Sequence, residues 1–555
     1  MSASVEVRFL PGPFVAEVEP GSTLLAAARK ANAPLEAPCD GAGICGKCLV
    51  QLSADGLAGL EPGVDLHGGD GGEHLVLACD ARVRSRVTAT ILPRGDELLA
   101  IVDQGMTVSW PLKPHITVNE ALDGSLVWAG GRLIADLVGC KPVANLGIAV
   151  DIGTTTLVVV LVDLASGREL AVASALNPQT AFGHDVLSRI RFAAEADGLA
   201  TMQRALMKTL NELIAEVCQR AGTQSSHIHE AVLGGNTCML HIAAAVDPAP
   251  LGRSPYTPSL AGGRHLQASE LGLAIAPHGL AYLPPVVSGF VGADITAGIL
   301  ATNLQRARET TLLLDVGTNG EMVLAHAGEL WATSAAAGPA FEGVNITYGM
   351  RAAKGAIDSI IVADVGDGAV HTIGDAPAVG ICGSGLIDLV SRLLQRGAIG
   401  KNGRFEPAVS PGVGRWDDDQ GRKVLRLAGD VVLTQKDVRQ VQLAKAAIRA
   451  GLEALLNSAG VGVSDVKRVL VAGSFGYHLR PESLAGAGLL PPQLAARVEA
   501  VGNTCKSGAV TLLTSDSARR ELLAVAKRTR SVELSNDDGF SRRFVSHMAF
   551  GESEV

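Results

Sequence analysis

The sequence predicts a multidomain protein of mixed α+β and α/β class, in which a small cysteine-bearing domain precedes a duplicated α/β unit. The chain has 555 residues, more than one hydrophobic core normally organises. Four of its nine cysteines lie at or before Cys79, and a strand–turn–strand pattern occurs twice further along the chain. Hydrophobic residues make up 47% of the chain and aromatic residues only 3%, so its cores must be built from Ala, Val, Leu and Ile.

Charge and hydropathy exclude several classes of partner. The formal net charge is −9 with no concentrated basic stretch, which argues against nucleic acid or an anionic membrane. The most apolar run, residues 146–164, is interrupted by Asp151 and Asp163 and is therefore not a membrane span. Residues 1–10 alternate apolar and polar side chains, which predicts a half-buried strand and not a signal peptide. We expect a cytoplasmic protein that works on a protein or a small molecule.

Residues 1–93 form the first predicted domain. Its expected elements are a strand pair, a short helix over residues 23–32, a cysteine loop, and strands near residues 48–52 and 87–92. Residues 94–145 are proline-containing and are predicted to be a linker or a small intervening domain.

Four cysteines in this domain have metal-ligand spacing. Cys39, Cys45, Cys48 and Cys79 follow the pattern C-x5-C-x2-C-x30-C. Three thiolates in one loop and a fourth from a distant strand can enclose a 2Fe–2S cluster, with one pair of sulfurs for each iron. A four-cysteine zinc site is the alternative, because C-x2-C is also a zinc half-site. The lone fourth cysteine favours the 2Fe–2S cluster, since zinc ribbons supply a second C-x2-C pair.

At these cysteines the sequence resembles the adrenodoxin-like branch of the 2Fe–2S ferredoxins. The resemblance implies a β-grasp fold, which the predicted hairpin and the helix start at Pro20-Gly-Ser-Thr23 fit. The remaining cysteines are spaced too widely for a metal motif and are predicted to be buried packing thiols. They are Cys140, Cys218, Cys238, Cys382 and Cys505.

An internal repeat organises the rest of the chain. Ala149-Val-Asp-Ile-Gly-Thr-Thr-Thr-Leu157 and Leu313-Leu-Asp-Val-Gly-Thr-Asn-Gly-Glu321 both read as a buried strand, then Asp, an apolar residue, Gly and Thr, then a second strand. Two copies predict two homologous lobes, residues 146–308 and 309–555. Helices are expected on the faces of their sheets. One covers residues 436–457, with Thr434 as its N-cap.

Each hairpin combines a carboxylate, a glycine and hydroxyl groups in one turn. Asp151 and Asp315 are predicted to hold a metal ion through water while backbone N–H and Oγ groups point at phosphate oxygens. Ordinary hairpin turns are the alternative. The predicted phosphate-binding residues are Gly153, Thr154, Thr155, Gly317, Thr318 and Asn319.

Two further features complete the predicted nucleotide site. An apolar strand at residues 469–472 leads into Gly473 and Ser474, where a nucleoside can lie against bare backbone; a plain strand-to-helix turn is the alternative. Glu321 begins the strand after the second loop, and a carboxylate there can orient the attacking water or simply be solvated. We predict catalytic roles for Asp151, Asp315 and Glu321.

The order of two phosphate-type loops followed by a strand with Gly-Ser resembles the actin, sugar-kinase and Hsp70 superfamily. The resemblance implies two ribonuclease-H-like lobes with ATP and Mg²⁺ between them, and lobe rotation coupled to ATP hydrolysis. The segment 287–298 looks like the helix that connects the lobes. Local strings resemble one branch of this superfamily, the reductive activators of corrinoid proteins. They lie at residues 234–239, 337–343, 381–388 and 442–448.

This branch implies an ATP-dependent iron–sulfur oxidoreductase. Its members return one electron to a corrinoid protein of a methyltransferase system, converting Co(II) to Co(I). The resemblance also implies an upstream electron donor and a homodimer. The reduction is uphill for a cluster near about −400 mV, so ATP-linked lobe movement is expected to supply the difference through differential binding of states. Two other functions stay open: a small-molecule kinase with a redox-sensing cluster, and a nucleotide-gated binding protein with a structural cluster.

Overall fold

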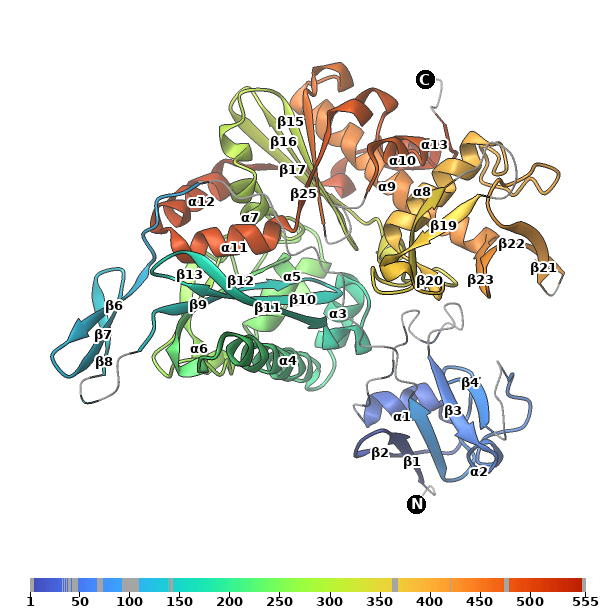
Figure 1. Ribbon diagram of the computed structural model, residues 1–555, viewed down its shortest axis with the longest axis horizontal. Helices are drawn as coiled ribbons and strands as arrows, with labels where there is room; N and C mark the ends of the chain where they lie inside the picture. The colour runs from blue at the N-terminus through green and yellow to red at the C-terminus, as the bar shows by residue number, and fades with distance from the viewer. Residues whose placement is uncertain are drawn as a thin grey trace.

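The structure is a computed structural model of the 555-residue chain. It describes residues 4–31, 33, 35, 37, 41, 48–66, 73–91, 109–137, 139, 143–361, 368–419, 421–473 and 479–551. Figure 1 shows a small N-terminal domain below two larger α/β lobes, with a thin sheet at one side. Among the described helices, none is long and apolar enough to cross a membrane.

The N-terminal domain is a five-stranded mixed sheet with one helix packed across it. The strand order is β2-β1-β5-β3-β4, and β1 runs parallel to β5, which gives the β-grasp arrangement. The predicted helix is confirmed as α1, which Thr23 caps by accepting a hydrogen bond from the Ala26 N–H at 3.1 Å. The elements are β1 Val5–Leu10, β2 Phe14–Val18, α1 Leu24–Lys30, β3 Leu49–Ser53, α2 Ala54–Ala58, β4 Glu73–Leu77 and β5 Val87–Ile91.

Part of the segment between this domain and the lobes folds as a three-stranded antiparallel sheet. Its strands are β6 Ile116–Ala121, β7 Gly124–Ala129 and β8 Arg132–Asp136. Ahead of it, the Lys113 N–H donates to the Thr514 carbonyl at 2.9 Å, and the Asp516 N–H donates to the Lys113 carbonyl at 2.8 Å. The segment is therefore hydrogen-bonded to residues 514 and 516.

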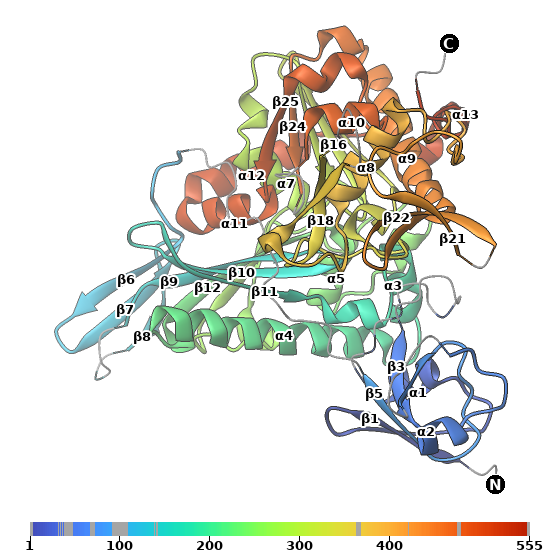
Figure 2. The same cartoon turned by 45° about the vertical axis from the view of Figure 1, so that its right-hand side comes forward.

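The first lobe is built on a six-stranded sheet of order β11-β10-β9-β12-β14-β13. Strands β9 and β10 form the predicted hairpin, and β12 runs parallel to β9. Its long helix α4 packs on one face of the sheet (Figure 2). The elements are β9 Leu146–Ile152, β10 Thr156–Asp163, β11 Arg168–Leu176, α3 Val186–Ala193, α4 Gly198–Ala221, β12 Ile228–Gly235, α5 Thr237–Ala243, β13 Arg264–Gln267, α6 Ala268–Leu271 and β14 Leu280–Leu283.

The second lobe repeats this sheet. Its order is β25-β24-β15-β16-β17-β26, so β15 and β16 occupy the places of β9 and β10, and β24 that of β12. Two three-stranded sheets, β19-β18-β20 and β21-β22-β23, lie between β17 and α9 in the chain. The strands are β15 Thr311–Val316, β16 Gly320–His326, β17 Glu329–Ala335, β18 Ala356–Ile361, β19 Ala369–Thr372, β20 Gly380–Ile381, β21 Arg415–Asp419, β22 Arg422–Ala428, β23 Val431–Thr434, β24 Arg468–Ala472, β25 Val498–Gly502 and β26 Arg530–Ser531.

The helices of this half include the one predicted from its cap. Helix α9 spans Gln435–Ala459, and Thr434 and Asp437 form a capping box at its start. The others are α7 Ala293–Ala301, α8 Gly383–Gln395, α10 Pro481–Gly486, α11 Thr504–Thr514, α12 Asp516–Arg528 and α13 Phe540–Ser546.

Helices α7 and α11 pack against each other between the two sheets (Figure 1). Helix α7 precedes the second lobe and packs into its core through Ile295 and Ile299, whereas α11 follows β25 and packs on β9 and β12 of the first lobe. The helix predicted over residues 287–298 thus begins later than expected, at Ala293. The α7–α11 pair therefore joins the cores of the two lobes.

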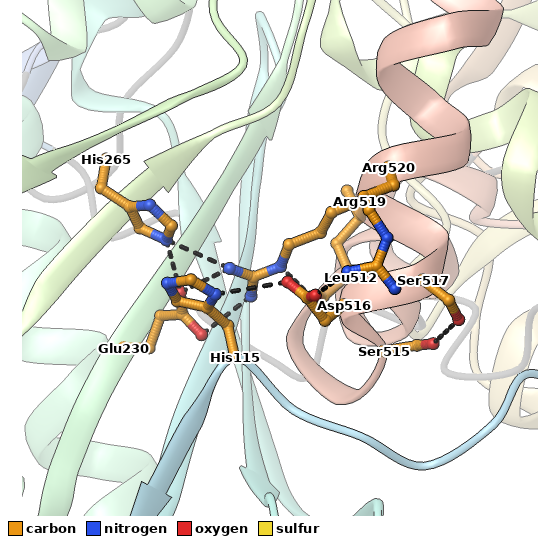
Figure 3. A network of polar contacts seen from close by, with 9 residues as sticks. All are labelled: His115, Glu230, His265, Leu512, Ser515, Asp516, Ser517, Arg519 and Arg520. Atoms are coloured by element: carbon orange, nitrogen blue, oxygen red, sulfur yellow. Dashed lines mark hydrogen bonds and ion pairs between the residues drawn. The ribbon is translucent and has the colours of Figure 1, made fainter. Parts of the chain in front are cut away.

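A buried ion pair attaches α12 to the first sheet. Figure 3 shows Arg519 of α12 donating to both carboxylate oxygens of Glu230 on β12, each at 2.8 Å, with His265 of β13 at 2.9 Å from the same carboxylate. His115 stacks on His265 and lies 3.3 Å from Asp516. Burial would raise the pKa of Glu230, but the Arg519 charge and these hydrogen bonds outweigh it and lower the pKa to about 2.

The cysteines predicted as packing thiols are buried where the structure describes them. Cys218, Cys238, Cys382 and Cys505 are all buried and unbridged. Cys140 lies outside the described residues.

Candidate functional site

A cavity between the lobes is lined by both predicted hairpins. From the first lobe it receives Asp151, Gly153, Thr154 and Thr155. From the second it receives Asp315, Gly317, Thr318, Asn319, Glu321 and, at the end of β24, Gly473. Ser474, the remaining residue predicted for the nucleotide site, lies outside the described residues. The structure thus brings together every described residue that the sequence predicted for this site.

Strand register explains how the two hairpins present their carboxylates. On β9, Asp151 lies opposite Val158 of β10, and on β15, Asp315 lies opposite Glu321 of β16. The next strand, β24, pairs Ala472 with Asp315, which places Gly473 beside the second hairpin. A Cβ on Gly473 would lie 2.6 Å from the Val316 carbonyl oxygen, and its φ is +115°. Only glycine fits this close approach.

Asn177 holds the backbone of the first loop. Its side-chain N–H donates to the Gly153 carbonyl at 2.8 Å, and its backbone N–H donates to the Thr155 carbonyl at 2.8 Å. Because a peptide unit is planar and trans, the N–H of Thr154 points away from the Gly153 carbonyl that Asn177 holds. The loop is therefore fixed with at least one backbone donor directed away from its support, as a phosphate-binding loop requires.

Side chains of the second lobe contact the first loop across the cavity. Thr155 Oγ1 donates to Glu342 Oε2, and Thr318 Oγ1 donates to Glu342 Oε1 at 2.7 Å. The Arg351 guanidinium donates to the Thr155 carbonyl at 3.4 Å. These contacts join the lobes at the loops themselves.

Five carboxylates line the cavity, and burial raises the pKa of several of them. They are Asp151, Asp294, Asp315, Glu321 and Glu342. Burial, followed by the charges of Asp294 and Asp151, raises the pKa of Asp315 to about 7. Burial likewise raises the pKa of Asp294 to about 7, and that of Glu321 well above its ordinary value. Such crowding is typical of a site that also takes a cation.

Asp151 is supported by neutral hydrogen-bond partners. Burial raises its pKa, whereas a hydrogen bond that Asn503 Nδ2 donates at 2.8 Å lowers it. The Cys505 thiol also hydrogen-bonds Asp151, and burial raises the pKa of this thiol well above its ordinary value. Cys505 is therefore not only a packing residue, because it lines the cavity beside this carboxylate.

The carboxylates fit a hydrated magnesium ion. Among the described residues, no three His, Cys, Asp or Glu side chains lie close enough to bind one metal ion directly. Mg²⁺ keeps several waters and is commonly held through one or two carboxylates together with substrate phosphates. Asp151 and Asp315 come to the cavity from different lobes, and the water-mediated role predicted for them stays a prediction.

Two of the four predicted cluster ligands lie at the same end of the β3–β4 strand pair. Cys48 directly precedes β3 and Cys79 lies two residues after the end of β4, and the terminal residues Leu49 and Leu77 are paired across these strands. The Ala78 N–H donates to the Cys48 carbonyl at 2.8 Å, and both cysteines are buried. Cys39 and Cys45 lie outside the described residues. The described pair fits thiolate ligation by residues from a loop and from a distant strand end.

Sequence reasoning missed several residues of the nucleotide cavity. Asp294 lies in the first turn of α7, within the segment predicted as the connecting helix, and Glu342 lies within the 337–343 string. The sequence linked both segments to known proteins but assigned no role to either carboxylate. Arg351 and Asn503 carried no signal, because only the meeting of the two lobes brings them to the hairpins.

Comparisons with known proteins decide the family. A model described as "2Fe-2S iron-sulfur cluster binding domain" matches residues 10–84. Models described as "RACo middle region" and "C-terminal domain of RACo the ASKHA domain" match residues 146–307 and 309–555. The corrinoid activation enzyme RamQ of Eubacterium limosum is 32% identical over 567 residues, covering 94% of this chain and 95% of that protein. The chain belongs to the family of corrinoid reductive activators.

Two further members of this family are similar to this chain over most of its length. A solved structure titled "Reductive activator for corrinoid,iron-sulfur protein" is 30% identical, has a TM-score of 0.74, and covers 98% of each chain. The Co(II) methylated amine-specific corrinoid protein reductase of Methanosarcina barkeri is 26% identical, covering 73% of this chain and 77% of the relative. The family confirms the predicted fold class, a ferredoxin domain followed by actin-type lobes. The domain boundaries at residues 93, 145 and 308 stay predictions.

Proposed function

We propose that this corrinoid reductive activator uses ATP to pass one electron to the Co(II) of a corrinoid protein and so regenerates Co(I). The observation that carries the proposal is the coexistence, in one member of this family, of a cysteine pair in a ferredoxin domain and an acid-lined cavity between two repeated hairpins. Its partners are a corrinoid protein of the kind named for its relatives and an upstream electron donor. The working unit is a homodimer.

ATP is the proposed occupant of the cavity. The first loop would direct its backbone donors at phosphate oxygens, Asp151 and Asp315 would hold Mg²⁺, and Gly473, which also lines the cavity, would lie beside the nucleoside. Glu321, buried on β16 beside Asp315, orients the attacking water. ATP and water yield ADP and phosphate, and the change in phosphate contacts alters how the lobes meet.

Arg351 is the proposed countercharge for the phosphates. It is the one Lys or Arg among the described residues that line the cavity, against five carboxylates. Its guanidinium already reaches the Thr155 carbonyl of the opposite lobe. A planar guanidinium suits bidentate contact with phosphate, so Arg351 binds ATP and draws the lobes together around it.

Cys39, Cys45, Cys48 and Cys79 are the proposed ligands of the cluster. A 2Fe–2S cluster supplies single electrons. The thiolates would hold it at one end of the β-grasp sheet, where Cys48 precedes β3 and Cys79 follows β4. The buried setting of both residues limits solvent access, which is one of the factors that set a cluster's potential.

The test compares two cysteine variants made in the full chain. Cys48→Ser is expected to remove iron and labile sulfide, retain ATP hydrolysis, and form no Co(I) when mixed with Mg-ATP, a reductant and Co(II) corrinoid proteins. The matched control, Cys218→Ser, alters another buried cysteine and is expected to retain all three properties. Co(I) formation by cluster-free Cys48→Ser contradicts the proposal. ATP turnover that depends on a small hydroxylated metabolite instead of a corrinoid protein indicates a kinase.

A further inference from the structure

One short segment of the first lobe contacts both the cysteine domain and the phosphate loop. It comprises residues 183–189, which lead into helix α3. Figures 1 and 2 both show α3 at the end of the first lobe that faces the cysteine domain. Asp185 caps the helix in a capping box with Ser188, so the start of α3 is fixed by its own side chains.

The contact with the cysteine domain is a hydrogen bond from His184. Its Nε2 lies 2.6 Å from the carbonyl oxygen of Ala37. A carbonyl can only accept, so His184 carries a hydrogen on Nε2 and donates it. Ala37 is buried in the core of the cysteine domain and stands two residues before Cys39. The contact therefore holds the chain immediately ahead of the first predicted cluster ligand.

The contact with the phosphate loop is made by Arg189. Its side chain is fully buried, and it donates to the Thr154 carbonyl, to the Gly183 carbonyl at 2.9 Å, and to Gln179 Oε1 at 3.1 Å. Because Arg189 holds the Thr154 carbonyl from behind, the N–H of Thr155 points the other way. One arginine thus fixes both the loop and the residue directly before His184.

Arg189 also places a positive charge behind the loop. Its hydrogen-bond acceptors in the described structure are neutral: two backbone carbonyls, an amide oxygen and the Met239 sulfur. Burial lowers its pKa to about 10, so the guanidinium stays charged at neutral pH. A buried cation without a hydrogen-bonded carboxylate is costly, and an anion at the front of the loop offsets part of that cost.

The turn at Gly183 is packed closely against the start of α3. A Cβ on Gly183 would lie 2.6 Å from Ser188 Oγ and 2.9 Å from the Arg189 backbone nitrogen, so no side chain fits there. His184 directly follows Gly183, whose carbonyl accepts from the same Arg189 side chain that holds Thr154.

We propose that residues 183–189 couple docking of the cysteine domain to occupation of the nucleotide site. When His184 holds Ala37, Arg189 keeps the first loop in its phosphate-binding form, and bound nucleotide in turn stabilises the docked domain. Linkage requires both effects to have the same size. The inference rests on the proposed nucleotide site and assigns Arg189 as a positioning residue for its first loop.

The first test measures nucleotide affinity in the cluster-loaded full chain by calorimetry with a non-hydrolysable ATP analogue and Mg²⁺. His184→Ala is expected to raise Kd about fivefold or more, the lower range of allosteric coupling. The matched control is His227→Ala, a part-buried histidine of the same lobe whose ring lies 3.3 Å from Thr223 Oγ1. An unchanged Kd in His184→Ala overturns the proposal, as does an equal change in the control.

The second test is hydrogen exchange of the α3 amides with and without the same analogue. Nucleotide is expected to slow exchange in the wild type and to have much less effect in His184→Ala. Arg189→Lys keeps the charge but cannot reach all its acceptors, so it is expected to weaken nucleotide binding and to abolish the further effect of His184→Ala in the double variant. Additive effects of the two changes on Kd contradict coupling through this segment.

Neither test contains a corrinoid protein, so its outcome is separate from that of the proposed function. Coupling without Co(I) formation contradicts the proposed electron transfer alone. Co(I) formation without coupling contradicts this inference alone. A wild-type protein that binds no nucleotide contradicts both. If Arg189→Lys does not fold, His184→Ala still decides the question, because His184 is only part-buried.

Discussion

The two lobes have the same hairpin but distribute charge around it differently. In the first lobe, Asp151 faces Val158 across the hairpin and accepts a hydrogen bond from Asn503. In the second lobe, Asp315 faces Glu321, and burial together with the charges of Asp294 and Asp315 raises the pKa of Glu321 well above its ordinary value. A backbone repeat has therefore been kept while its side chains diverged.

The difference assigns distinct tasks to the two loops. The first loop is held from behind by neutral and positive donors, Asn177 and Arg189, which suits a support for phosphate. The second concentrates carboxylates, which suits a hydrated cation and a water nucleophile. The cavity is lined by residues of both lobes, so the proposed nucleotide site needs both loops.

The largest effects are expected at the two aspartates. Asp151→Ala and Asp315→Ala should each lower the ATP turnover number by at least about 10²-fold, the scale of losing one preorganised electrostatic contact, while the iron–sulfur absorption stays unchanged. Asp430→Ala, a surface change in the second lobe where the side chain is 97% exposed, serves as the control. Wild-type turnover in either site variant would show that the hairpins are structural turns.

A second prediction tests the difference between the two hairpins at Glu321. Glu321 has an apolar counterpart in Val158, so Glu321→Gln should lower kcat about tenfold to a hundredfold with little change in KM, because the group acts on water and not on ATP binding. The comparison variant is Glu329→Gln on the neighbouring strand β17. A raised KM with normal kcat would assign Glu321 to ATP binding instead.

For Arg351 we expect a change in the KM for ATP, in contrast to the change in kcat expected for Glu321. Removing its charge in Arg351→Ala should raise the KM for ATP roughly tenfold, on the scale of one charge-assisted hydrogen bond, and Arg351→Lys should restore part of the loss. Steady-state ATPase kinetics at saturating Mg²⁺ measure both constants. An unchanged KM in Arg351→Ala would place the phosphates elsewhere in the cavity.

The smallest effect on catalysis and a clear effect on stability are expected at the buried ion pair of Figure 3. Glu230→Gln leaves Arg519 buried without its carboxylate and should cost about 3–5 kcal/mol of unfolding free energy. The pKa of Glu230 is lowered to about 2, so the stabilisation is present above its ordinary value near 4.5 and is lost as pH falls towards 2. Denaturant unfolding at pH 7 and pH 3 should therefore show a smaller deficit in acid. A deficit that grows in acid would contradict this sign.

Much of this architecture follows from short-range sequence patterns. The hairpins at Asp151 and Asp315 and the capped helix α9 were predicted because a turn signal and an apolar periodicity fix such elements locally. The sequence did not distinguish the sheet β6-β7-β8 from a linker, because its strands are short and partly exposed.

The rest of the site depends on contacts between distant segments. Asn503, Asp294 and Arg351 reach the hairpins only because α7, α11 and both lobes pack together. No local sequence pattern indicates that these segments pack together. Likewise, the cysteine spacing predicted the ligands, but the contact of His184 with Ala37 joins two domains and has no signature in either.

The most direct test of the account is the yield of Co(I) from a Co(II) corrinoid protein, followed by its absorption with and without Mg-ATP at one fixed reductant potential. Coupling predicts Co(I) only when nucleotide, cluster-loaded protein and the corrinoid partner are all present, and an ATPase rate that responds to that partner. Asp315→Ala should keep a reducible cluster yet produce no Co(I). Equal yields with and without ATP would contradict the account and leave a ferredoxin joined to an ATPase of separate purpose.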